Sequence, residues 1–394
     1  MHRALCERLR VLAVIETLSL GGAEHALLGQ LSALAERGHS CQVAILWPPY
    51  SLAADFEAAG ITVHRLGLSH RWNVPQGIRR LRDISRRMRP DVIHAHLFFA
   101  GLYVASTRVL DPRPVRTVTF HNLGYDSHPA RTPWLKARKQ IDRIAMRHGI
   151  DRRLAVSRAV AEHYAGHLGL PQVSVVPNGL DLKLLATHPR RPRAEVRARY
   201  GTGMDEPVLL LPGTLKKEKG HRFLLKALAR LRESGVTPRV LLAGAGPLEA
   251  GLRAQATALG LDGQVAFLGQ LKRSELLDVI ASVDLVVMPS THEGAPVAAS
   301  EAMCLRTPLL ASAVGGLNEL ANYAGVCLIR PSDPEMLALE IARALERPVH
   351  GQPPSTPAGS APRAAAADLL DIDESAQLLE AEYSKALDYR GLMK

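Results

Sequence analysis

The sequence predicts an α/β fold with two domains, each built on a parallel sheet that helices cover on both faces. Three observations lead to this fold class. Short apolar runs of strand type alternate with longer stretches of helical type along most of the chain. A second series of the same kind begins near residue 208, after the turn sequence PNGLD at 177–181. The length of 394 residues suits two domains of ordinary size.

The first series starts with a strand at 11–18, followed by a helix that begins after Gly21 and Gly22, because paired glycines allow a tight turn. The other strands of the first half are expected at 41–47, 61–66, 91–97, 116–122, 153–157 and 173–179. Its other helices are expected near 51–59, 76–88, 99–109, 132–148 and 158–168.

The second series has strands in six segments, at 208–211, 239–247, 265–269, 284–288, 309–312 and 326–329. Its helices are expected at 221–233, up to about 259, at 273–282, 295–303 and 334–346. Residues 347–366 are rich in Pro and Ala, which is typical of a linker, and 367–394 has apolar residues on one helical face. The predicted domains are therefore 1–182 and 183–346, followed by a linker and a terminal helix.

Composition narrows the class of protein. Hydrophobic residues make up 47% of the chain, enough for real cores, while aromatic residues make up only 4%, which argues against a stacking surface for single-stranded nucleic acid. The four scattered cysteines form no Cys-x-x-Cys pair, and no apolar stretch reaches 18 residues. These features favour a cytoplasmic protein with reduced cysteines and no membrane-spanning helix.

The positive charge is concentrated in the first half of the chain. Residues 1–190 hold 26 Lys and Arg against 14 Asp and Glu, whereas residues 191–394 hold 23 against 24. Two expected helices, 76–88 and 132–148, are especially rich in Arg and Lys. Such runs are usually solvated faces, but two of them in one domain favour an anionic partner. We hypothesise that this domain docks on the inner face of the cell membrane.

Residues 284–302, DLVVMPSTHEGAPVAASEA, combine a strand, a polar loop and the start of a helix. This arrangement often binds anions, since amides and the helix dipole favour a phosphate at 294–297. Glu293 and Glu301 flank that position and can accept hydrogen bonds from hydroxyl groups. Two glutamates at this spacing are weak evidence alone, but together with the anion site they fit a nucleotide sugar.

The same segment resembles the Glu-Gly-x-Pro-x4-Glu-Ala signature of the retaining GT-B glycosyltransferases of family 4, and VGGLNEL follows at a fitting distance. Other motifs occur in the order of that family. These are SLGGAE (19–24), His121 after a strand, PNGLD (177–181), GTLKKEKG (213–220) and GAGP (244–247). One position departs from the pattern, because Thr214 stands where the family has an arginine. Lys216 or Lys217 is a candidate to supply the missing charge.

The resemblance implies two Rossmann-like domains facing a central cleft, with a nucleotide-diphosphate sugar bound by the second domain and a glycan or lipid-linked acceptor by the first. The implied catalytic residues are His121, Lys219 and Glu293. The implied donor-binding residues are Gly22, Gly213, Thr214, Lys219, Gly244, Gly246, Pro247, Glu293, Gly294, Ala295, Pro296, Val297 and Glu301. The implied acceptor-binding residues are Gly21, Gly22, His121 and Asn122. No cofactor or metal is implied.

Two sequence patterns could suggest a metal site, but both are interpreted as structural. His94 and His96 share one face of a predicted strand, but no third ligand stands at a useful spacing, so hydrogen-bonded roles are expected. Asp371 and Asp373 are expected on a solvated face of the terminal helix.

Three other functions stay open at the level of sequence. A nucleotide-sugar epimerase of the same architecture would act on the donor without an acceptor. A nucleic-acid binder using the basic half would show steeply salt-dependent binding. A nicotinamide oxidoreductase is disfavoured, because GAGP lacks the third glycine of a dinucleotide fingerprint.

Overall fold

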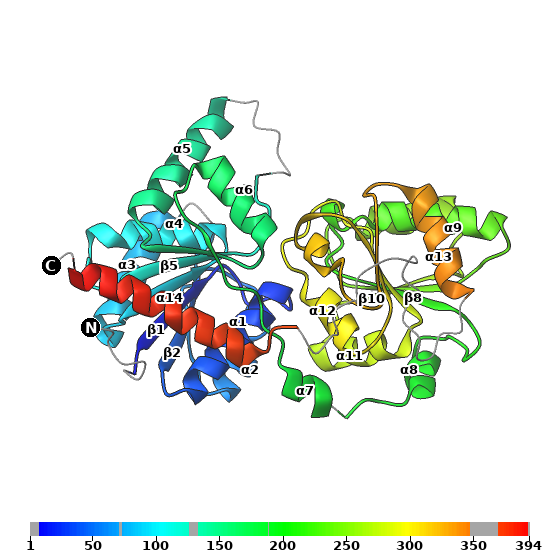
Figure 1. The fold of residues 1–394 in the computed structure, drawn as a ribbon, viewed down its shortest axis with the longest axis horizontal. Coiled ribbons are helices and arrows are strands. Elements are labelled where there is room, and N and C mark those ends of the chain that lie inside the picture. Colours follow the sequence, from blue (N-terminus) through cyan, green and yellow to red (C-terminus); the bar gives the residue numbers. More distant parts are fainter. Residues whose placement is uncertain (1–7, 71–72, 126–132, 188, 347–368, 393–394) are drawn as a thin grey trace. The chain divides into compact units, whose positions relative to one another are not determined.

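The computed structural model describes residues 8–70, 73–125, 133–187, 189–346 and 369–392 (Figure 1). Contacts between residues divide the chain into two compact units. Unit 1 contains Met1–Asp181 and Leu370–Lys394, and unit 2 contains Leu182–Leu369. The division after Asp181 lies one residue from the boundary expected from sequence, while the expected linker at 347–366 lies outside the described residues.

Unit 1 is a seven-stranded parallel sheet in the order β3-β2-β1-β4-β5-β6-β7. Its inner strands are almost completely buried, as expected for a sheet with helices on both faces. The strands are β1 (Arg10–Ile15), β2 (Ser40–Ile45), β3 (Thr62–Arg65), β4 (Val92–His96), β5 (Val115–Phe120), β6 (Arg152–Ala155) and β7 (Ser174–Val175).

The helices of unit 1 divide between the two faces of its sheet. They are α1 (Gly22–Glu36), α2 (Ala53–Ala58), α3 (Val74–Met88), α4 (Phe98–Ser106), α5 (Pro133–His148), α6 (Arg158–Leu168) and α14 (Ile372–Leu392). A 3-10 turn, η1 (Thr107–Val109), extends α4. Apolar residues of α1, α2 and α14 share one core with the strands. On the other face, α3 packs against α4, and α4 packs against α5 (Figure 1).

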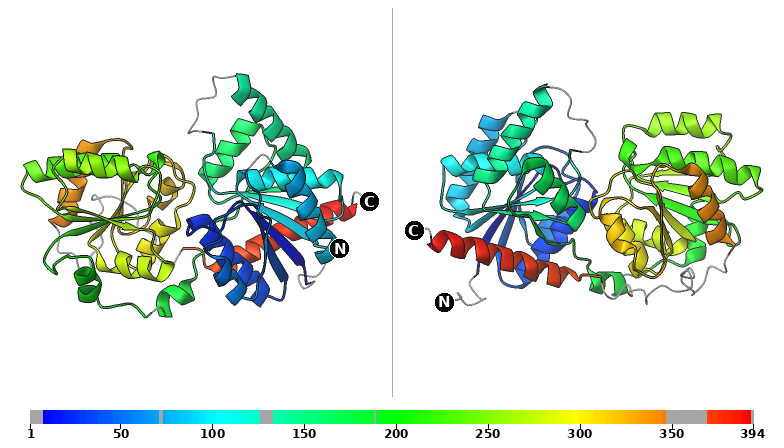
Figure 2. Two further views of the ribbon diagram at one scale, coloured as in Figure 1. Left: turned by 180° about the vertical axis from the view of Figure 1, so that it is seen from behind. Right: turned by 45° about the horizontal axis from the view of Figure 1, so that its top comes forward.

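Helix α14 brings the end of the chain back to unit 1, where it packs beside α1 and against β5 and β6 (Figure 2). The chain enters it through a short parallel bridge between Leu180 and Asp371. Gly179, in the turn sequence PNGLD, is not among the glycines with positive φ. A Cβ there would instead lie 2.6 Å from Ile372 Cα, so the glycine allows this close crossing.

The interpretation of Asp371 and Asp373 as a solvated helix face is wrong for Asp371. This residue precedes α14, and its Oδ1 accepts a hydrogen bond from the backbone amide of Asp373 at 2.9 Å. The first amides of a helix have no partner within the helix, so an acidic side chain at this position stabilises its start.

Unit 2 is a six-stranded parallel sheet in the order β10-β9-β8-β11-β12-β13. The strands are β8 (Val208–Pro212), β9 (Arg239–Ala243), β10 (Val265–Gly269), β11 (Leu285–Met288), β12 (Leu309–Ser312) and β13 (Val326–Ile329). The helices are α7 (Leu182–Thr187), α8 (Arg193–Arg199), α9 (His221–Glu233), α10 (Glu249–Ala258), α11 (Arg273–Ser282), α12 (Val297–Cys304) and α13 (Pro334–Leu345). Two 3-10 turns are η2 (Lys217–Lys219) and η3 (Gly315–Leu320).

Two separate cores cover the faces of this sheet. Residues of α9, α10 and α13 form one core with the strands, and residues of α8, α11 and α12 form the other. Buried charges anchor α8, since Arg197 Nη2 donates to Asp284 Oδ2 at 2.7 Å and the same carboxylate oxygen accepts from Val208 N at 2.7 Å. A buried charge needs such partners to offset its desolvation.

Most expected elements are present, and helices 221–233 and 273–282 have the expected bounds. Helices α7 and α8 were not expected, and β7 is much shorter than the expected strand at 173–179. Pro177 lacks an amide hydrogen, which makes the end of that segment a poor strand. Among the described residues, no helix combines the length and the hydrophobicity needed to cross a bilayer.

Candidate functional site

The strand order reverses at one point in each sheet, which we call the switch point. It lies between β1 and β4 in unit 1 and between β8 and β11 in unit 2. Open parallel sheets bind ligands beyond the carboxyl ends of the strands at such a point. The loops that follow these four strands are therefore where a site is expected.

Three loops of unit 2 are joined by backbone hydrogen bonds at its switch point. Leu215 N donates to Ala245 O at 3.1 Å, which ties the loop after β8 to the loop after β9. Thr291 N donates to Glu218 O at 2.8 Å, which ties the loop after β11 to the loop after β8. The motifs GTLKKEKG, GAGP and HEGAP, separate in sequence, are thus parts of one structure.

Three glycines make this close approach possible. A Cβ on Gly244 would lie 1.9 Å from Gly213 O, and a Cβ on Gly220 would lie 1.9 Å from Pro289 O. Gly220 also has a φ of +72°, which side chains other than glycine rarely adopt. A Cβ on Gly246 would likewise lie 2.6 Å from Leu215 O, so the expected donor-binding residues Gly244 and Gly246 are required by the packing of the loops themselves.

Lys219 and Glu293 form an ion pair across the switch point of unit 2. Lys219 Nζ lies 2.7 Å and 2.9 Å from the two carboxylate oxygens of Glu293. Ser290 Oγ donates a further hydrogen bond to Glu293 Oε1 at 2.7 Å. Glu293 is only 6% exposed, whereas the Lys219 side chain is 22% exposed. The pair therefore has a cation at the accessible side and a carboxylate fixed behind it.

Helix α12 begins directly after this loop. Pro296 is its N-cap and Val297 its first residue, so the positive end of its dipole lies at the expected phosphate position, next to Gly294 and Ala295. Glu301 is 3% exposed, and its Oε1 lies 3.1 Å from Arg273 Nε, at the start of α11. Glu301 is therefore already paired with a cation within unit 2.

Some expected donor-binding residues lie on the outer surface of these loops. Thr214 and Pro247 are exposed, as are Lys216 and Lys217, the two candidates to replace the missing arginine. Buried His221 follows Lys219 and Gly220 directly, and its pKa is lowered to about 4 by burial and by the charge of Lys219. The imidazole next to Lys219 is therefore neutral near pH 7.

In unit 1, His121 lies with two other histidines at the ends of β4 and β5. His96 Nδ1 is 3.1 Å from His121 Nε2, and the rings of His94 and His96 are 4.1 Å apart. His94 and His96 thus have the hydrogen-bonded roles expected from sequence, and His121 is an additional neighbour that the sequence pattern did not indicate. Strand pairing of β4 with β5 brings His121 close, although 25 residues separate it from His96.

Burial keeps these three histidines neutral near pH 7. It lowers the pKa of His121 to about 4, of His94 to about 3, and of His96 well below its usual value. His94 is hydrogen-bonded on both ring nitrogens, to Tyr383 Oη at 2.6 Å and Thr119 Oγ1 at 2.8 Å. Within the described part of the chain, no group of three His, Cys, Asp or Glu side chains is arranged to hold a metal ion.

The glycine turn of SLGGAE is supported by Glu24, which is buried. Glu24 Oε1 accepts hydrogen bonds from Thr17 Oγ1 at 3.1 Å and Ser19 Oγ at 2.5 Å. A Cβ on Gly21 would lie 2.4 Å from Glu24 Oε2, so a side chain there would displace the folded-back carboxylate. Gly22 is the first residue of α1, at the carboxyl end of β1.

The structure thus brings the expected residues together in two groups. Lys219, Glu293 and the glycine loops share the switch point of unit 2, whereas Gly21, Gly22, His121 and Asn122 lie at the carboxyl edge of the sheet of unit 1. Asn122 Oδ1 accepts from Tyr164 Oη at 3.4 Å. The direct partners Arg273, Ser290 and His96 were not identified as site residues from sequence, because the contacts that each makes depend on which loops and strands meet in the fold.

Two protein-family models match the two halves of the chain. Residues 20–184 match the model described as Glycosyltransferase Family 4, and residues 192–355 match the model described as Glycosyl transferases group 1. The chain belongs to the GT-B glycosyltransferases of the family 4 type. The resemblance inferred from the ordered motifs is therefore confirmed.

Curated relatives of this family match over part of their length. A putative glycosyltransferase EpsF of Bacillus subtilis is 30% identical over 247 residues, which cover 60% of this chain and 61% of that protein. A GDP-mannose-dependent α-(1-6)-phosphatidylinositol dimannoside mannosyltransferase of Mycobacterium tuberculosis is 34% identical over 183 residues, covering 46% of each chain. The chain thus spans about half to two thirds of the length of the relatives it matches.

Solved structures agree on the fold. HepE of Anabaena, in complex with UDP and glucose, superposes with a TM-score of 0.72 at 19% identity, covering 98% of this chain and 99% of that one. The lipopolysaccharide glycosyltransferase WaaG superposes with a TM-score of 0.68 at 16% identity, covering 96% and 99%. The predicted GT-B architecture of two Rossmann-like domains is confirmed.

Proposed function

We propose that this protein is a retaining glycosyltransferase that moves a sugar from a nucleotide-diphosphate sugar to an acceptor hydroxyl. The observation that carries the proposal is the Lys219–Glu293 pair at the switch point of unit 2, beside the positive end of α12. A cation and a helix start suit a diphosphate, and a fixed carboxylate suits the hydroxyl groups of a sugar. Family membership supports the same reaction class.

Donor binding would rearrange the charges of this site. In the structure Glu293 accepts both short contacts of Lys219. A bound diphosphate offers Lys219 a stronger anion, which would leave Glu293 to accept hydrogen bonds from the donor sugar. We propose that Glu301, held by Arg273, accepts from the ribose hydroxyls, and that the segment 294–297 contacts the diphosphate. Stabilising the departing diphosphate is then the main electrostatic contribution to the rate.

His121 would contact the transferred sugar as a neutral imidazole. Its Nδ1 is buried and has no hydrogen-bond partner among the described residues, while its Nε2 lies next to His96. A buried polar atom without a partner is costly, so a ligand hydroxyl at this position would be stabilised. The charged form is disfavoured, and His121 is therefore a hydrogen-bonding group in this proposal and not a general acid.

No side chain is placed as a nucleophile in this proposal. The leaving phosphate would take the proton of the acceptor hydroxyl as the new bond forms on the same face, which retains the configuration of the sugar. No metal is part of the proposal, and Lys219 with the start of α12 would provide the positive charge. Activity in excess chelator equal to that in added Mg²⁺ is the expected result.

The acceptor is proposed to be a glycan or a lipid-linked glycan. The relatives include proteins whose names refer to teichuronic acid biosynthesis and to phosphatidylinositol dimannoside, both glycans or glycolipids. We propose that the acceptor binds unit 1, where Gly21, Gly22, His121 and Asn122 lie at the carboxyl edge of the sheet.

Association of unit 1 with an anionic membrane surface is proposed on the exposed face of α5. Ile141 and Ile144 are 64% and 60% exposed there, and three basic residues, Lys136, Arg143 and Arg147, are exposed on the same helix. Exposed apolar residues among basic ones favour an anionic bilayer surface. Sedimentation with vesicles containing about 30% anionic lipid should exceed that with neutral vesicles, and charge reversal at these three positions should abolish the difference.

The main test is a panel of nucleotide sugars, screened by thermal shift and then by product formation with candidate glycan acceptors. A ligand at about 100 times its Kd stabilises the native state by about 2.7 kcal/mol, which raises Tm measurably. Glu293→Ala should remove the part of the shift that depends on the sugar while keeping the shift caused by the nucleotide alone. An isomerised donor sugar released without any acceptor would overturn the proposal in favour of an epimerase.

A further inference from the structure

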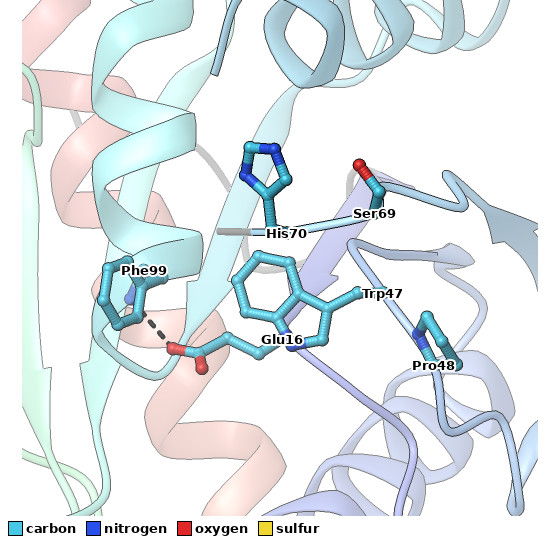
Figure 3. Close-up of a pocket in the computed structure, with 6 residues that line it drawn as sticks. All are labelled: Glu16, Trp47, Pro48, Ser69, His70 and Phe99. Atoms are coloured by element: carbon cyan, nitrogen blue, oxygen red, sulfur yellow. Dashed lines mark hydrogen bonds between the residues drawn. The ribbon is translucent and has the colours of Figure 1, made fainter. Parts of the chain in front are cut away.

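A cavity of about 400 Å³ lies at the switch point of unit 1, and none of its described lining residues is among the site residues considered so far. Its lining comes from the ends of β1, β2 and β4 and from the segment after β3 (Figure 3). Its described lining residues are Glu16, Trp47, Pro48, Ser69, His70 and Phe99. The volume falls in the range of small-molecule sites.

Glu16 is the first residue after β1, and its carboxylate reaches across the switch point. Oε1 accepts a hydrogen bond from the backbone amide of Phe99 at 2.8 Å, in the first turn of α4 (Figure 3). This contact fixes the direction of the carboxylate, and the helix start favours a negative group there. A carboxylate can accept about four hydrogen bonds, so it can also accept from a ligand.

Trp47 supplies a flat wall that its neighbours hold at a fixed angle. Its indole meets the ring of Phe99 edge-on, with centroids 6.2 Å apart and planes at 71°, and meets Tyr103 at 6.4 Å and 65°. Trp47 N also donates to Glu16 O at 3.0 Å, so the aromatic wall and the carboxylate belong to adjacent strand ends. Trp47 and Phe99 are half-buried, which leaves part of each ring facing the cavity.

The chemistry of the lining selects among ligands. No Lys or Arg is among the described residues of the lining, so this part of the cavity offers no cation for the diphosphate of a donor. A rigid aromatic face suits the C–H face of a saturated ring, while a fixed carboxylate suits the hydroxyl groups at its edge. Ser69 and His70 are exposed at the rim, where they can hydrogen-bond other hydroxyls.

We infer that this cavity binds a neutral polyhydroxylated ring of the acceptor, a sugar or a cyclitol, with Trp47 against its face and Glu16 accepting from its hydroxyls. The assignment of this ring to the acceptor rests on the proposed function. Binding of the ring itself does not require the donor. Glu16, Trp47 and Phe99 then determine the specificity for the acceptor ring, together with the acceptor-binding residues proposed above.

Tryptophan fluorescence gives a direct test without any nucleotide. The chain has three tryptophans, and replacing Trp72 and Trp134 by Phe leaves Trp47 as the reporter. The probes are the methyl α-glycosides of glucose, galactose, mannose and N-acetylglucosamine, with myo-inositol and, as an anionic comparison, glucose 6-phosphate. At least one neutral ring should change the emission with a Kd in the range of about 1–100 mM, and glucose 6-phosphate should bind less tightly than methyl glucoside.

Glu16→Gln keeps the shape of the side chain and should weaken binding of that probe about tenfold. Glu57→Gln, which alters an exposed acid of α2 in the same unit, is the matched control and should leave binding unchanged. Trp47→Phe should remove the fluorescence change, and saturation-transfer NMR should show weaker contact of the probe with this variant. Equal affinity in Glu16→Gln and the parent overturns the inference, as does the absence of any response to all five neutral probes.

Kinetics separate this inference from the proposed function. If transfer is observed, Glu16→Gln should raise the acceptor KM about tenfold while the donor Kd stays the same. If no donor is bound or turned over but a neutral ring binds next to Trp47, the proposed function fails and the ring site stands. If transfer proceeds with an unchanged acceptor KM in Glu16→Gln, the function stands and the ring site fails.

Discussion

The two units share one architecture and differ in the chemistry at the switch point. Both sheets are parallel, and in both the first strand of the series pairs with the fourth, as β1 with β4 and β8 with β11. In unit 2 this junction carries the Lys219–Glu293 ion pair among tightly packed glycine loops. In unit 1 it carries Glu16 bonded to a helix amide, with aromatic walls and neutral histidines nearby.

This difference shows what the fold determines and what the side chains determine. The reversal of strand order places a ligand site in each unit, whatever the residues. A cation beside a helix start then makes the site of unit 2 suitable for an anion, whereas an acid among aromatic rings makes that of unit 1 suitable for a neutral hydroxylated ring. Each substitution below acts on one unit and should leave the chemistry of the other unchanged.

The largest effect is expected from Lys219→Ala. Removing the cation at the switch point of unit 2 should lower kcat by about 10²–10³-fold, because the departing diphosphate loses its charged partner. The rate is measured at saturating donor and acceptor. Lys226→Ala, which changes an exposed lysine of α9, is the control and should keep the parent rate. A similar loss in both variants would contradict a specific role for Lys219.

Gly220→Ala tests the packing of the loops in unit 2. The new Cβ would meet Pro289 O at 1.9 Å in a residue with φ of +72°, so we expect destabilisation of about 2–5 kcal/mol together with weaker donor binding. Gly235→Ala is the matched control, since its φ is +79° but nothing lies within 4 Å of the new Cβ. It should cost only about 1 kcal/mol. Equal effects would mean that backbone strain, and not the close approach, requires glycine at 220.

Acidification should destabilise unit 1 through its buried histidines. Burial lowers the pKa of His121 to about 4 and that of His94 to about 3 in the folded state. The unfolded chain therefore binds more protons between about pH 6.5 and 4, and stability falls as pH falls through this window, by up to about 1.4 kcal/mol per pH unit for each such histidine. His221 adds a term of the same sign in unit 2, where its folded pKa is about 4.

One buried acid of unit 1 opposes this trend. Burial raises the pKa of Asp142 to about 6, so the folded state binds the extra proton there and gains stability as pH falls from 6 towards 4. The urea midpoint followed from pH 7.5 to 4.5 measures the sum. His121→Asn should flatten the curve, and His148→Asn, at an exposed position of α5, should not. A midpoint that is constant below pH 6.5 would contradict the burial of uncharged histidines.

The smallest effect is expected from Tyr383→Phe. Loss of the hydroxyl leaves His94 Nδ1 buried without its partner, which should cost about 1–2 kcal/mol in the unfolding of unit 1. Tyr389→Phe on the same helix is the control, because Tyr389 is 64% exposed. Donor binding should be unchanged in both variants. If Tyr383→Phe is as stable as the parent, the hydrogen bond between Tyr383 and His94 does not contribute to the free energy of unfolding.

Most of the fold could be predicted from sequence, because alternating apolar runs report directly on a parallel sheet. Helices such as 221–233 have an unbroken apolar period and an adjacent glycine, so even their ends could be located. Helices α7 and α8 could not, since they are short and α8 is anchored by ion pairs between Arg193, Arg197 and Asp284, far apart in sequence. Long-range ion pairs leave no local pattern.

The sequence motifs predicted which residues belong to the candidate site of unit 2. They did not predict which of these residues form ion pairs or hydrogen bonds with one another. The motifs identified Lys219, Glu293 and Glu301 separately, whereas their partners depend on which loops meet. The ring site of unit 1 left no signal, because Glu16, Trp47 and Phe99 are single residues after three different strands. Only strand order brings such residues together.

Helix α14 makes unit 1 discontinuous in sequence, and this affects the order in which the two units can fold during synthesis. The chain leaves the unit after Asp181 and returns at Leu370, so the partner of His94 and part of the apolar core emerge from the ribosome only after unit 2. At about 5–20 residues per second, roughly 10–40 s pass between these points. During that interval unit 2 can complete its own folding, while the nascent unit 1 keeps an apolar face of α1 uncovered and open to chaperones.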